Sequence, residues 1–407
     1  MSSNRLDSHS QDAGVSEHDR EPREDYEDEQ YEDTAGQSST ASPDGEHDNE
    51  NEKDLELQKT KSSALAEQLP LPKEILFISF VCLAQFMTQA ALGQTISIIH
   101  ILGAQFNITN PGTLSWLIAG YSLTVGTFIL LFGRFGDIYG YKKMFVIGFA
   151  WFSLWSMIAG LSVYSNKVLF IFSRVFQGIG PSICLPNGLA LFGAAYAPGP
   201  RKNLAFALFG AMAPVGSIIG ALFAGLFALA WWPWTFWSFS ITAACITVGS
   251  MIVIPEPPKK SEAARTIRGL TEQLDLLGGA VGVTALILFN FAWNMAGVTG
   301  WTKGYNIATL VLGILFAVAF FWIELRIAKS PLIPFGVFDS DVSFVCACIA
   351  CGWGCFGVWF YYIWQFMLVS KAGSPLHAVA WICPVAVAGA CASVITGKLL
   401  GILRPAW

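Results

Sequence analysis

Charged residues are scarce in this chain. Asp, Glu, Lys and Arg make up 13% of its 407 residues, whereas 54% are hydrophobic. Even this small share is unevenly placed. Residues 1–67 hold 20 acidic and six basic residues, which leaves 9 acidic and 18 basic residues for 68–407. So little charge over so much apolar sequence excludes a soluble globular protein for 68–407, because a water-soluble domain needs a charged surface.

Residues 1–67 almost entirely lack branched apolar residues and are rich in Ser, Asp, Glu and Gln. Such a segment buries too little apolar surface to offset the entropy of ordering, so we predict a disordered acidic tail. It also lacks a basic start followed by a short apolar run and a small-residue cleavage site, so we expect no cleavable signal peptide. The first membrane-spanning helix would then act as the insertion signal.

Groupings that carry enzymatic or metal chemistry are also missing. Three of the five histidines lie in the acidic tail, and the other two, His100 and His377, stand alone near predicted helix ends. All nine cysteines lie in hydrophobic segments, four of them within 346–355. Because no turns or second pair flank this cluster, we predict buried packing residues rather than a metal site. We expect no enzyme, no cofactor, no metal and no nucleic-acid partner.

Long apolar runs, by contrast, are abundant. A helix needs about 20 predominantly apolar residues to cross a bilayer, and ten segments after residue 74 reach that length. The predicted spans are 75–98, 113–135, 144–163, 168–192, 204–227, 234–254, 275–298, 305–327, 342–366 and 377–401. We therefore predict an all-α polytopic protein embedded in the lipid bilayer.

The connections between the spans indicate how the chain is organised. The longest of them, residues 255–272, is predicted to be a cytoplasmic linker. It separates six helices at 75–254, which we predict to form one lobe, from two helices at 275–327 and two more at 342–401.

Lysine and arginine in the connections predict the orientation, because cytoplasmic loops carry an excess of both. The even-numbered connections and the C-terminal end hold thirteen of them, and the odd-numbered connections hold three. This distribution places the even connections and the N-terminal tail in the cytoplasm. The glycosylation sequon Asn107-Ile108-Thr109 falls in the first connection, which this topology places outside.

The connection between the second and third spans reads GRFGDIYGYKK (Gly133–Lys143). Its three glycines permit a tight reversal of the chain, and its lysines hold the turn in the cytosol. The pattern resembles the loop signature of the major facilitator superfamily, G-x-x-x-D-R-x-G-R-K. The resemblance implies a conformational latch made by Gly133, Asp137, Gly140, Lys142 and Lys143.

In that latch the aspartate engages the positive N-terminal end of a helix in the other lobe. This chain departs from the pattern at two positions. Ile138 and Tyr141 each stand where the family has an arginine, so the charge relay through the first of these arginines is absent.

The fourth span contains SRVFQGIGPS (Ser173–Ser182), with Arg174 a few residues inside the apolar segment. A charge there is costly unless it faces a cavity or a partner, and Gln177 lies one turn further on. The element resembles the family's R-x-x-Q-G-x-G, which implies that the arginine lines the central cavity and takes part in proton coupling. The alternative is an arginine whose head reaches the outer surface.

The fifth span reads FGAMAPVGSIIGALFAGLF (Phe209–Phe227). Gly216 and Gly220 form a face of small residues suited to close helix packing, and Pro214 is expected to bend the helix. The spacing also resembles the antiporter signature G-x-x-x-G-P-x-x-G. The resemblance is drawn through Gly210 and Pro214, with Ala213 in place of the second glycine; Gly210 lies four residues before the proline, where the signature places its first glycine five before. This resemblance favours export.

No aspartate or glutamate lies in the middle of a span: Glu74, Asp275 and Glu324 are near span ends, and Gly93 stands where multidrug members of the family have an aspartate. A proton-coupled pump needs a titrating group in its cavity, so proton antiport is less well supported than transport itself. A polar but uncharged cavity is predicted to include Gln89, Gln94, Tyr121, Gln177 and Asn187.

Taken together, residues 75–407 resemble a fungal 14-helix drug:proton antiporter, and most closely the aminotriazole-resistance, boron- or ammonium-transporter branch. Supporting stretches include Ala197–Gly216 and Pro331–Phe338. The resemblance implies two six-helix lobes around a midplane cavity. This chain would supply a complete first lobe, two inserted helices and the first two helices of a truncated second lobe.

Three hypotheses follow. The first is an exporter of small solutes that takes up protons in exchange, monomeric and located in the plasma membrane or the vacuolar membrane. The second is a proton-independent facilitator or importer. The third is a membrane sensor or truncated product that does not transport, whose acidic tail recruits partners.

Overall fold

The computed structural model describes residues 69–256, 274–328, 330–333, 335–371 and 373–402. All of them belong to one compact unit, Lys53–Trp407. The predicted disordered tail and all but the first two residues of the predicted linker lie outside the described residues.

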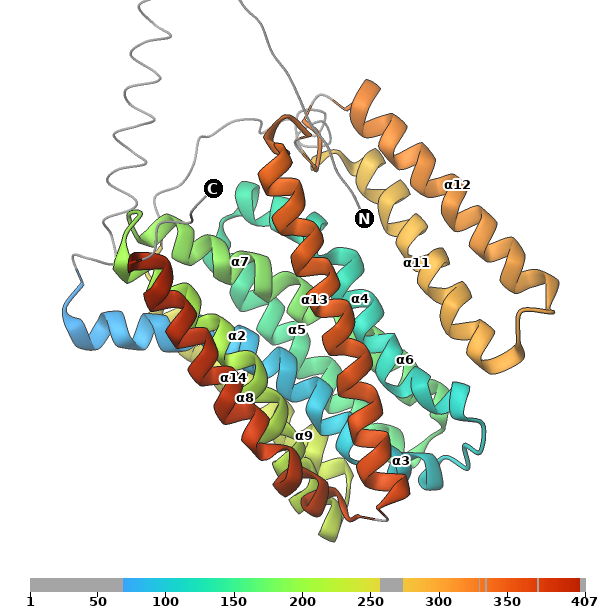
Figure 1. Ribbon diagram of the computed structural model, residues 1–407. Helices are drawn as coiled ribbons and strands as arrows, with labels where there is room; N and C mark the ends of the chain where they lie inside the picture. The colour runs from blue at the N-terminus through green and yellow to red at the C-terminus, as the bar shows by residue number, and fades with distance from the viewer. Residues whose placement is uncertain (1–68, 257–273, 329, 334, 372, 403–407) are drawn as a thin grey trace, which may run out of the picture. The chain divides into compact units, whose positions relative to one another are not determined.

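Helices are the only regular secondary structure in these ranges (Figure 1). Short 3₁₀ or π segments are labelled η. The elements in chain order are α2 (Leu71–Ser97), α3 (Ile99–Gln105), α4 (Pro111–Tyr139), α5 (Tyr141–Leu161), η1 (Ser162–Tyr164), α6 (Lys167–Gln177), α7 (Ile179–Ala195), α8 (Pro200–Ala230), α9 (Pro233–Val253), α11 (Leu276–Thr299), α12 (Gly304–Arg326), η2 (Phe335–Val337), α13 (Ser340–Gln365), η3 (Phe366–Ser370) and α14 (Pro375–Ile402).

Ten helical stretches of the described chain are long and apolar enough to cross a membrane. They coincide with the ten predicted segments, so the prediction of an all-α protein with ten spans is confirmed. Two breaks were not predicted. The first span is followed by the short α3, and the fourth divides at Gly178 into α6 and α7. Gly178 packs directly against the backbone of α4, where a Cβ would collide with Tyr121.

Local sequence explains where several helices begin. Asn110 precedes α4, and its side chain accepts hydrogen bonds from the backbone N–H of Gly112 (2.8 Å) and Thr113 (3.3 Å). Asn166 caps α6 in the same way through the N–H of Leu169 (3.0 Å). Such side chains satisfy N–H groups that have no partner within the helix.

The reversal between α4 and α5 is made by one residue, Gly140, whose φ of +99° suits glycine. The prediction that three glycines form this turn is therefore wrong for Gly133 and Gly136, which lie inside α4. Helix α4 continues to Tyr139, so the first part of the loop signature is helical.

Helices α2 and α8 pack along each other through small residues. A Cβ on Gly216 would collide with the backbone of Phe86, and one on Gly220 would collide with the backbone of Ala90. On α2, Gly93 faces the backbone of Ser217 equally closely. The predicted packing role of the two α8 glycines is therefore visible in the structure, and it follows the small-residue rule for helix contacts in membranes.

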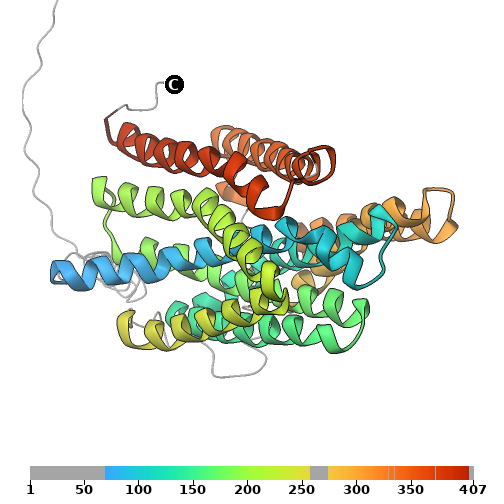
Figure 2. The same cartoon turned by 90° about the horizontal axis from the view of Figure 1, so that it is seen from below.

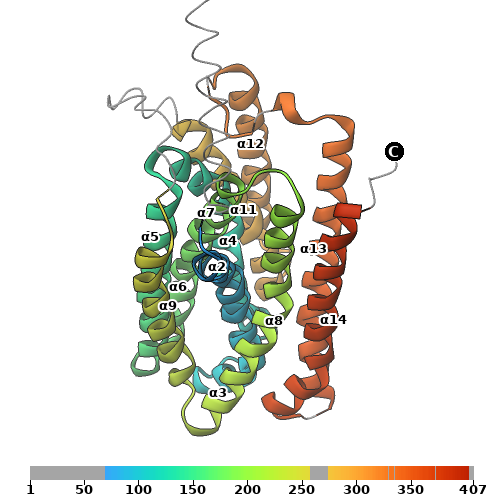
Figure 3. The ribbon, with the colours of Figure 1, turned by 90° about the vertical axis from the view of Figure 1, so that its left-hand side faces the viewer.

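The four α-helices that the structure describes after α9 lie outside the bundle that the helices before them form. Helices α11 and α12 form a hairpin beside α4 (Figure 1), and Asn110 at the start of α4 donates to the Val298 carbonyl of α11 (3.3 Å). Helix α14 lies along α8, with α13 next to it, as the two further views show (Figures 2 and 3).

Packing around α13 contradicts one prediction. The cysteines were expected to be buried packing residues, and Cys82 and Cys184 are. The other seven are exposed in the described chain: Cys245, Cys346, Cys348, Cys351, Cys355, Cys383 and Cys391. The four cysteines of α13 are exposed because this helix contacts few other elements. Only Phe360 and Trp364 are buried along it.

Candidate functional site

Arg174 on α6 is completely buried. Its Nη2 donates to the Ala91 carbonyl of α2 (3.0 Å), its Nε to the Leu117 carbonyl of α4 (3.4 Å) and its Nη1 to Oε1 of Gln177. The guanidinium also lies over the Tyr121 ring, with 4.5 Å between its Cζ and the ring centroid. One side chain thus joins three helices.

The hydrogen bonds continue into a fourth helix. Gln177 is also fully buried, and its Nε2 donates to Oγ of Ser156 on α5 (2.6 Å). The Tyr121 hydroxyl donates to the Thr88 carbonyl of α2 (2.8 Å). We call Arg174, Gln177, Tyr121, Ser156 and Thr88 the arginine cluster; it ties together α2, α4, α5 and α6.

This burial rules out the alternative in which Arg174 reaches the outer surface. Within the described ranges, no carboxylate acts on the guanidinium. Its charge is instead met by two backbone carbonyls, an amide oxygen and a ring face. A buried charge without a counter-ion is costly unless such groups replace its hydration, so the cluster is a place where one positive charge is held without neutralisation.

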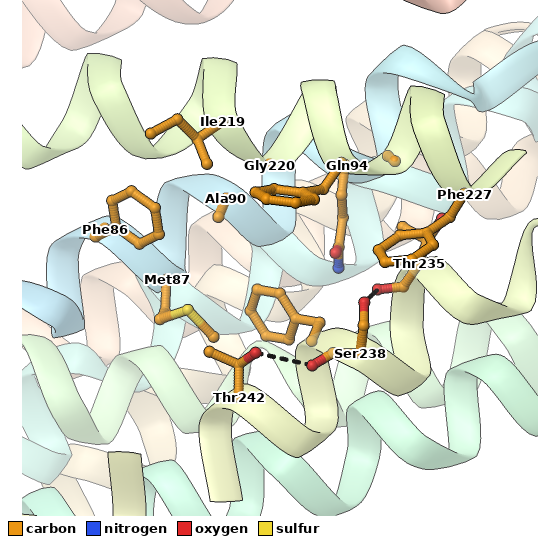
Figure 4. A pocket seen from close by; sticks show the side chains of 13 residues that line it. Phe86, Met87, Ala90, Gln94, Ile219, Gly220, Phe227, Thr235, Ser238 and Thr242 are labelled. Atoms are coloured by element: carbon orange, nitrogen blue, oxygen red, sulfur yellow. Dashed lines mark hydrogen bonds between the residues drawn. The ribbon is translucent and has the colours of Figure 1, made fainter. Parts of the chain in front are cut away.

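Of the six residues predicted to line a polar cavity, three come together in the arginine cluster. Gln89 and Gln94 on α2 do not join it. The Gln89 Oε1 and Gln94 Nε2 atoms are buried and make no hydrogen bond within the described part of the chain. Gln94 instead lines a mostly apolar pocket of about 220 Å³ between α2, α8 and α9 (Figure 4).

Asn187 lies elsewhere again. Its Nδ2 donates to the carbonyls of Ile183 (2.7 Å) and Phe132 (3.2 Å), which binds α7 to the end of α4 that carries the loop signature. The Asn187 side chain packs against Gly136, where a Cβ would meet its Oδ1 atom. It therefore supports the loop region rather than a cavity in this structure.

The predicted latch residues lie at the turn between α4 and α5. Asp137 is exposed, and its Oδ1 accepts a hydrogen bond from the Tyr141 hydroxyl (2.6 Å). Lys142 and Lys143 follow on α5, and Gly133 lies one turn before Asp137 inside α4. Tyr141, which replaces a family arginine, therefore supplies the donor that Asp137 uses here.

We expect Tyr141→Phe to release Asp137 without unfolding the bundle. The substitution removes one exposed hydrogen bond to a charged group, and such bonds contribute at most about 1.5–3 kcal/mol. The thermal unfolding midpoint of the purified protein should fall by a few degrees at most. Tyr139→Phe, on the exposed end of α4, is the matched control. A collapse of the folded fraction in Tyr141→Phe alone would show that the turn depends on this bond.

Two residues that join neighbouring elements were not identified from the sequence. Arg134 was counted only as a loop charge, yet its Nη2 donates to the Pro331 carbonyl beyond α12. Ser156 had no signal of its own, because a serine inside an apolar helix is common and only the partner Gln177 reveals its role.

The α8 residues that resemble the antiporter signature divide into two groups. Gly216 and Gly220 pack against α2, as described above. Gly210 is exposed and loosely approaches α14, with Ser393 Oγ at 3.9 Å from the position of a Cβ, and Pro214 contacts Gly389 of the same helix. The sequon residue Asn107 is exposed between α3 and α4, with a φ of +50°.

Comparison of the sequence with known proteins shows its family. Residues 78–407 match the Major Facilitator Superfamily. The low affinity ammonium transporter of Saccharomyces cerevisiae is 49% identical over 339 residues, which cover 82% of this chain and 65% of that protein. Efflux pump terG of Aspergillus terreus is 44% identical over 83% of this chain and 64% of the pump.

The aminotriazole resistance protein of Saccharomyces cerevisiae is 38% identical, over 82% of this chain and 61% of that relative. This chain therefore spans somewhat less than two thirds of the length of these three relatives. The match nevertheless covers nearly all of the described helices, including every helix that contributes to the arginine cluster. The chain belongs to the Major Facilitator Superfamily.

Proposed function

We propose that the chain moves small solutes across a membrane as a secondary transporter, and that the arginine cluster is the polar centre of its first lobe. The observation that carries this proposal is the complete burial of Arg174 without a carboxylate partner among the described residues. Charged side chains inside membrane-spanning segments mark the paths of ions or polar solutes. The similarity of this chain to an ammonium transporter and an efflux pump also supports solute transport.

Within that function we propose export by proton antiport, in the 14-helix drug:proton antiporter branch. Support comes from the efflux-pump relatives and from Pro214 on α8, which matches the proline of the antiporter signature. The solute would occupy the face of the lobe next to the arginine cluster. Arg174 would attract the electron-rich groups of the solute, and movement of a proton would change the balance of charge around it.

A second candidate is a proton-independent facilitator or importer. Two observations favour it: the 49% identical relative is an ammonium transporter, and no acidic side chain faces Arg174 in the described chain. For either candidate we propose a monomer in the plasma membrane, with the vacuolar membrane as the alternative. The N-terminus and the even-numbered connections would lie in the cytoplasm, as the loop lysines and arginines indicate.

A growth experiment separates the two candidates. The chain is expressed in yeast that lacks its own ammonium transporters and, separately, in yeast sensitive to aminotriazole. Antiport predicts aminotriazole resistance that disappears when an uncoupler collapses the proton gradient. Facilitated import predicts growth on low ammonium regardless of the uncoupler. Growth equal to the empty vector under both conditions, with the protein present in the membrane, would contradict both.

A further inference from the structure

Besides Arg174, only two charged side chains are buried in the described residues, and they are neighbours. Asp275, which precedes α11, is 8% exposed, and Glu324, near the end of α12, is 4% exposed. Both face Gly278: a Cβ on that glycine would collide with Oδ2 of Asp275 and lie 3.0 Å from Oε1 of Glu324. Two carboxyl groups therefore share one buried corner of the hairpin.

The hydrogen bonds of the two groups are unequal. Oε1 and Oε2 of Glu324 accept from the backbone N–H of Leu332 (3.3 Å) and Ile333 (3.4 Å). Oδ1 of Asp275 accepts from the N–H of Gly278 (3.1 Å). Oδ2 of Asp275 is buried and makes no hydrogen bond to any residue that the structure describes. Three of the four carboxyl oxygens thus accept a hydrogen bond from a backbone N–H. The fourth, Oδ2 of Asp275, faces the Glu324 carboxyl group and has no donor among the described residues.

We propose that this corner is a proton-binding site, in which the carboxyl groups of Asp275 and Glu324 share one proton. Two adjacent buried carboxylates cannot both remain ionised without a counter-charge, because burial and like-charge repulsion both oppose it. One shared proton removes the repulsion and gives Oδ2 of Asp275, the carboxyl oxygen without an N–H donor, a hydrogen-bond partner in Glu324.

Among the described residues, no positively charged side chain balances the two carboxyl groups. Asp275 is the only charged side chain of the described chain that acts on Glu324. On α4, Arg134 binds the Pro331 carbonyl and Asp137 is exposed, and on α12, Arg326 is exposed. Neither arginine forms an ion pair with either carboxyl group.

The site fastens three parts of the chain together. Asp275 begins α11, Glu324 ends α12, and Leu332 and Ile333 belong to the segment that Arg134 of α4 holds through Pro331. Loss of the proton would set two carboxylates against each other and weaken the hold of Glu324 on that segment. The sequence alone gave these acids no role, because they lie at helix ends far apart in the chain. The proposal stands whether or not the chain transports solutes.

Infrared spectroscopy of the purified wild-type protein in lipid tests the proposal without any substitution. We expect a carbonyl stretching band of a protonated carboxylic acid at pH 7 that shifts in ²H₂O. Asp275→Asn should remove the band, and Asp339→Asn, at an exposed residue whose side chain makes no capping hydrogen bond, should keep it. Absence of the band from the wild-type protein, or its persistence in Asp275→Asn, would overturn the proposal.

The pH dependence of unfolding gives a second readout. The folded state would hold one proton that the unfolded chain releases above about pH 5, so stability should fall as pH rises, by up to tenfold in the folding equilibrium per pH unit. Asp275→Asn keeps a donor toward Glu324 and should flatten this dependence. Glu324→Gln places an amide N–H against a backbone donor and should lower the folded fraction. An unchanged pH dependence in Asp275→Asn would overturn the proposal.

Discussion

Arg174→Ala is expected to reduce solute movement by about 100-fold or more. The substitution removes the buried guanidinium and with it three hydrogen bonds, to Ala91, Leu117 and Gln177. Hydrogen bonds to charged groups contribute about 1.5–3 kcal/mol each, and the loss of about 2.7 kcal/mol from a rate-limiting step corresponds to 100-fold. The measurement is the initial rate of flux for whichever solute the growth experiment identifies, per amount of protein in the membrane.

Arg174→Lys separates charge from geometry. Lysine keeps the positive charge but presents it as a point on a flexible stem, so it cannot reach the same three acceptors together. We expect it to retain about a tenth of the flux, whereas Arg201→Lys, an exposed residue at the start of α8, should retain all of it. Full flux in Arg174→Ala, with a normal amount of folded protein, would remove the arginine cluster from the transport function.

Gly216→Ala and Gly220→Ala are expected to cause the largest losses of folded protein. Each added methyl would collide with a backbone atom of α2, at Phe86 or Ala90, and a backbone cannot rotate away as a side chain can. Overpacking a tight interface costs about 1–3 kcal/mol and occasionally more. The measurement is the thermal unfolding midpoint and the monodisperse fraction after extraction in detergent.

The same helix offers a matched control. Gly210 is exposed, and the nearest atom to its added Cβ is Ser393 Oγ at 3.9 Å, which is ordinary contact. Gly210→Ala should therefore fold as well as the wild type, because the added methyl does not disturb packing. Equal losses of folded protein from all three substitutions would show that the contact between α2 and α8 is no tighter than the surroundings of Gly210.

The membrane-crossing architecture could be predicted from the sequence because one physical quantity, the thickness of the bilayer, requires about 20 apolar residues per helix. The break at Gly178 could not be predicted, since a glycine inside an apolar helix is common. It reflects the close contact with Tyr121 on α4, which local sequence does not contain.

The candidate site was only partly predictable. Arg174 and Gln177 could be identified because a charge in an apolar span is rare, but their partners on α2 and α4 are backbone carbonyls, which any residue type supplies. The predicted cavity role of Gln94 depended on which face of α2 turns inward. Its pattern of apolar residues did not decide that, because the helix is apolar all round.

The cysteine prediction failed for a related reason. The residues around 346–355 have the composition of a buried helix, but burial also depends on what packs against it. Among the described residues, little does so, and the exposed apolar side chains of α13, such as Phe344 at 70% and Val358 at 62%, show the same pattern.

Labelling from one side of the membrane tests most directly the claim that these apolar helices cross the bilayer, with the loop signature on the inner side. A membrane-impermeant maleimide is applied to intact cells that express Asn107→Cys or Lys142→Cys, with the unsubstituted chain as the background for its nine native cysteines. The account predicts labelling of Asn107→Cys in intact cells and of Lys142→Cys only after permeabilisation. Labelling of both substitutions in intact cells would contradict it.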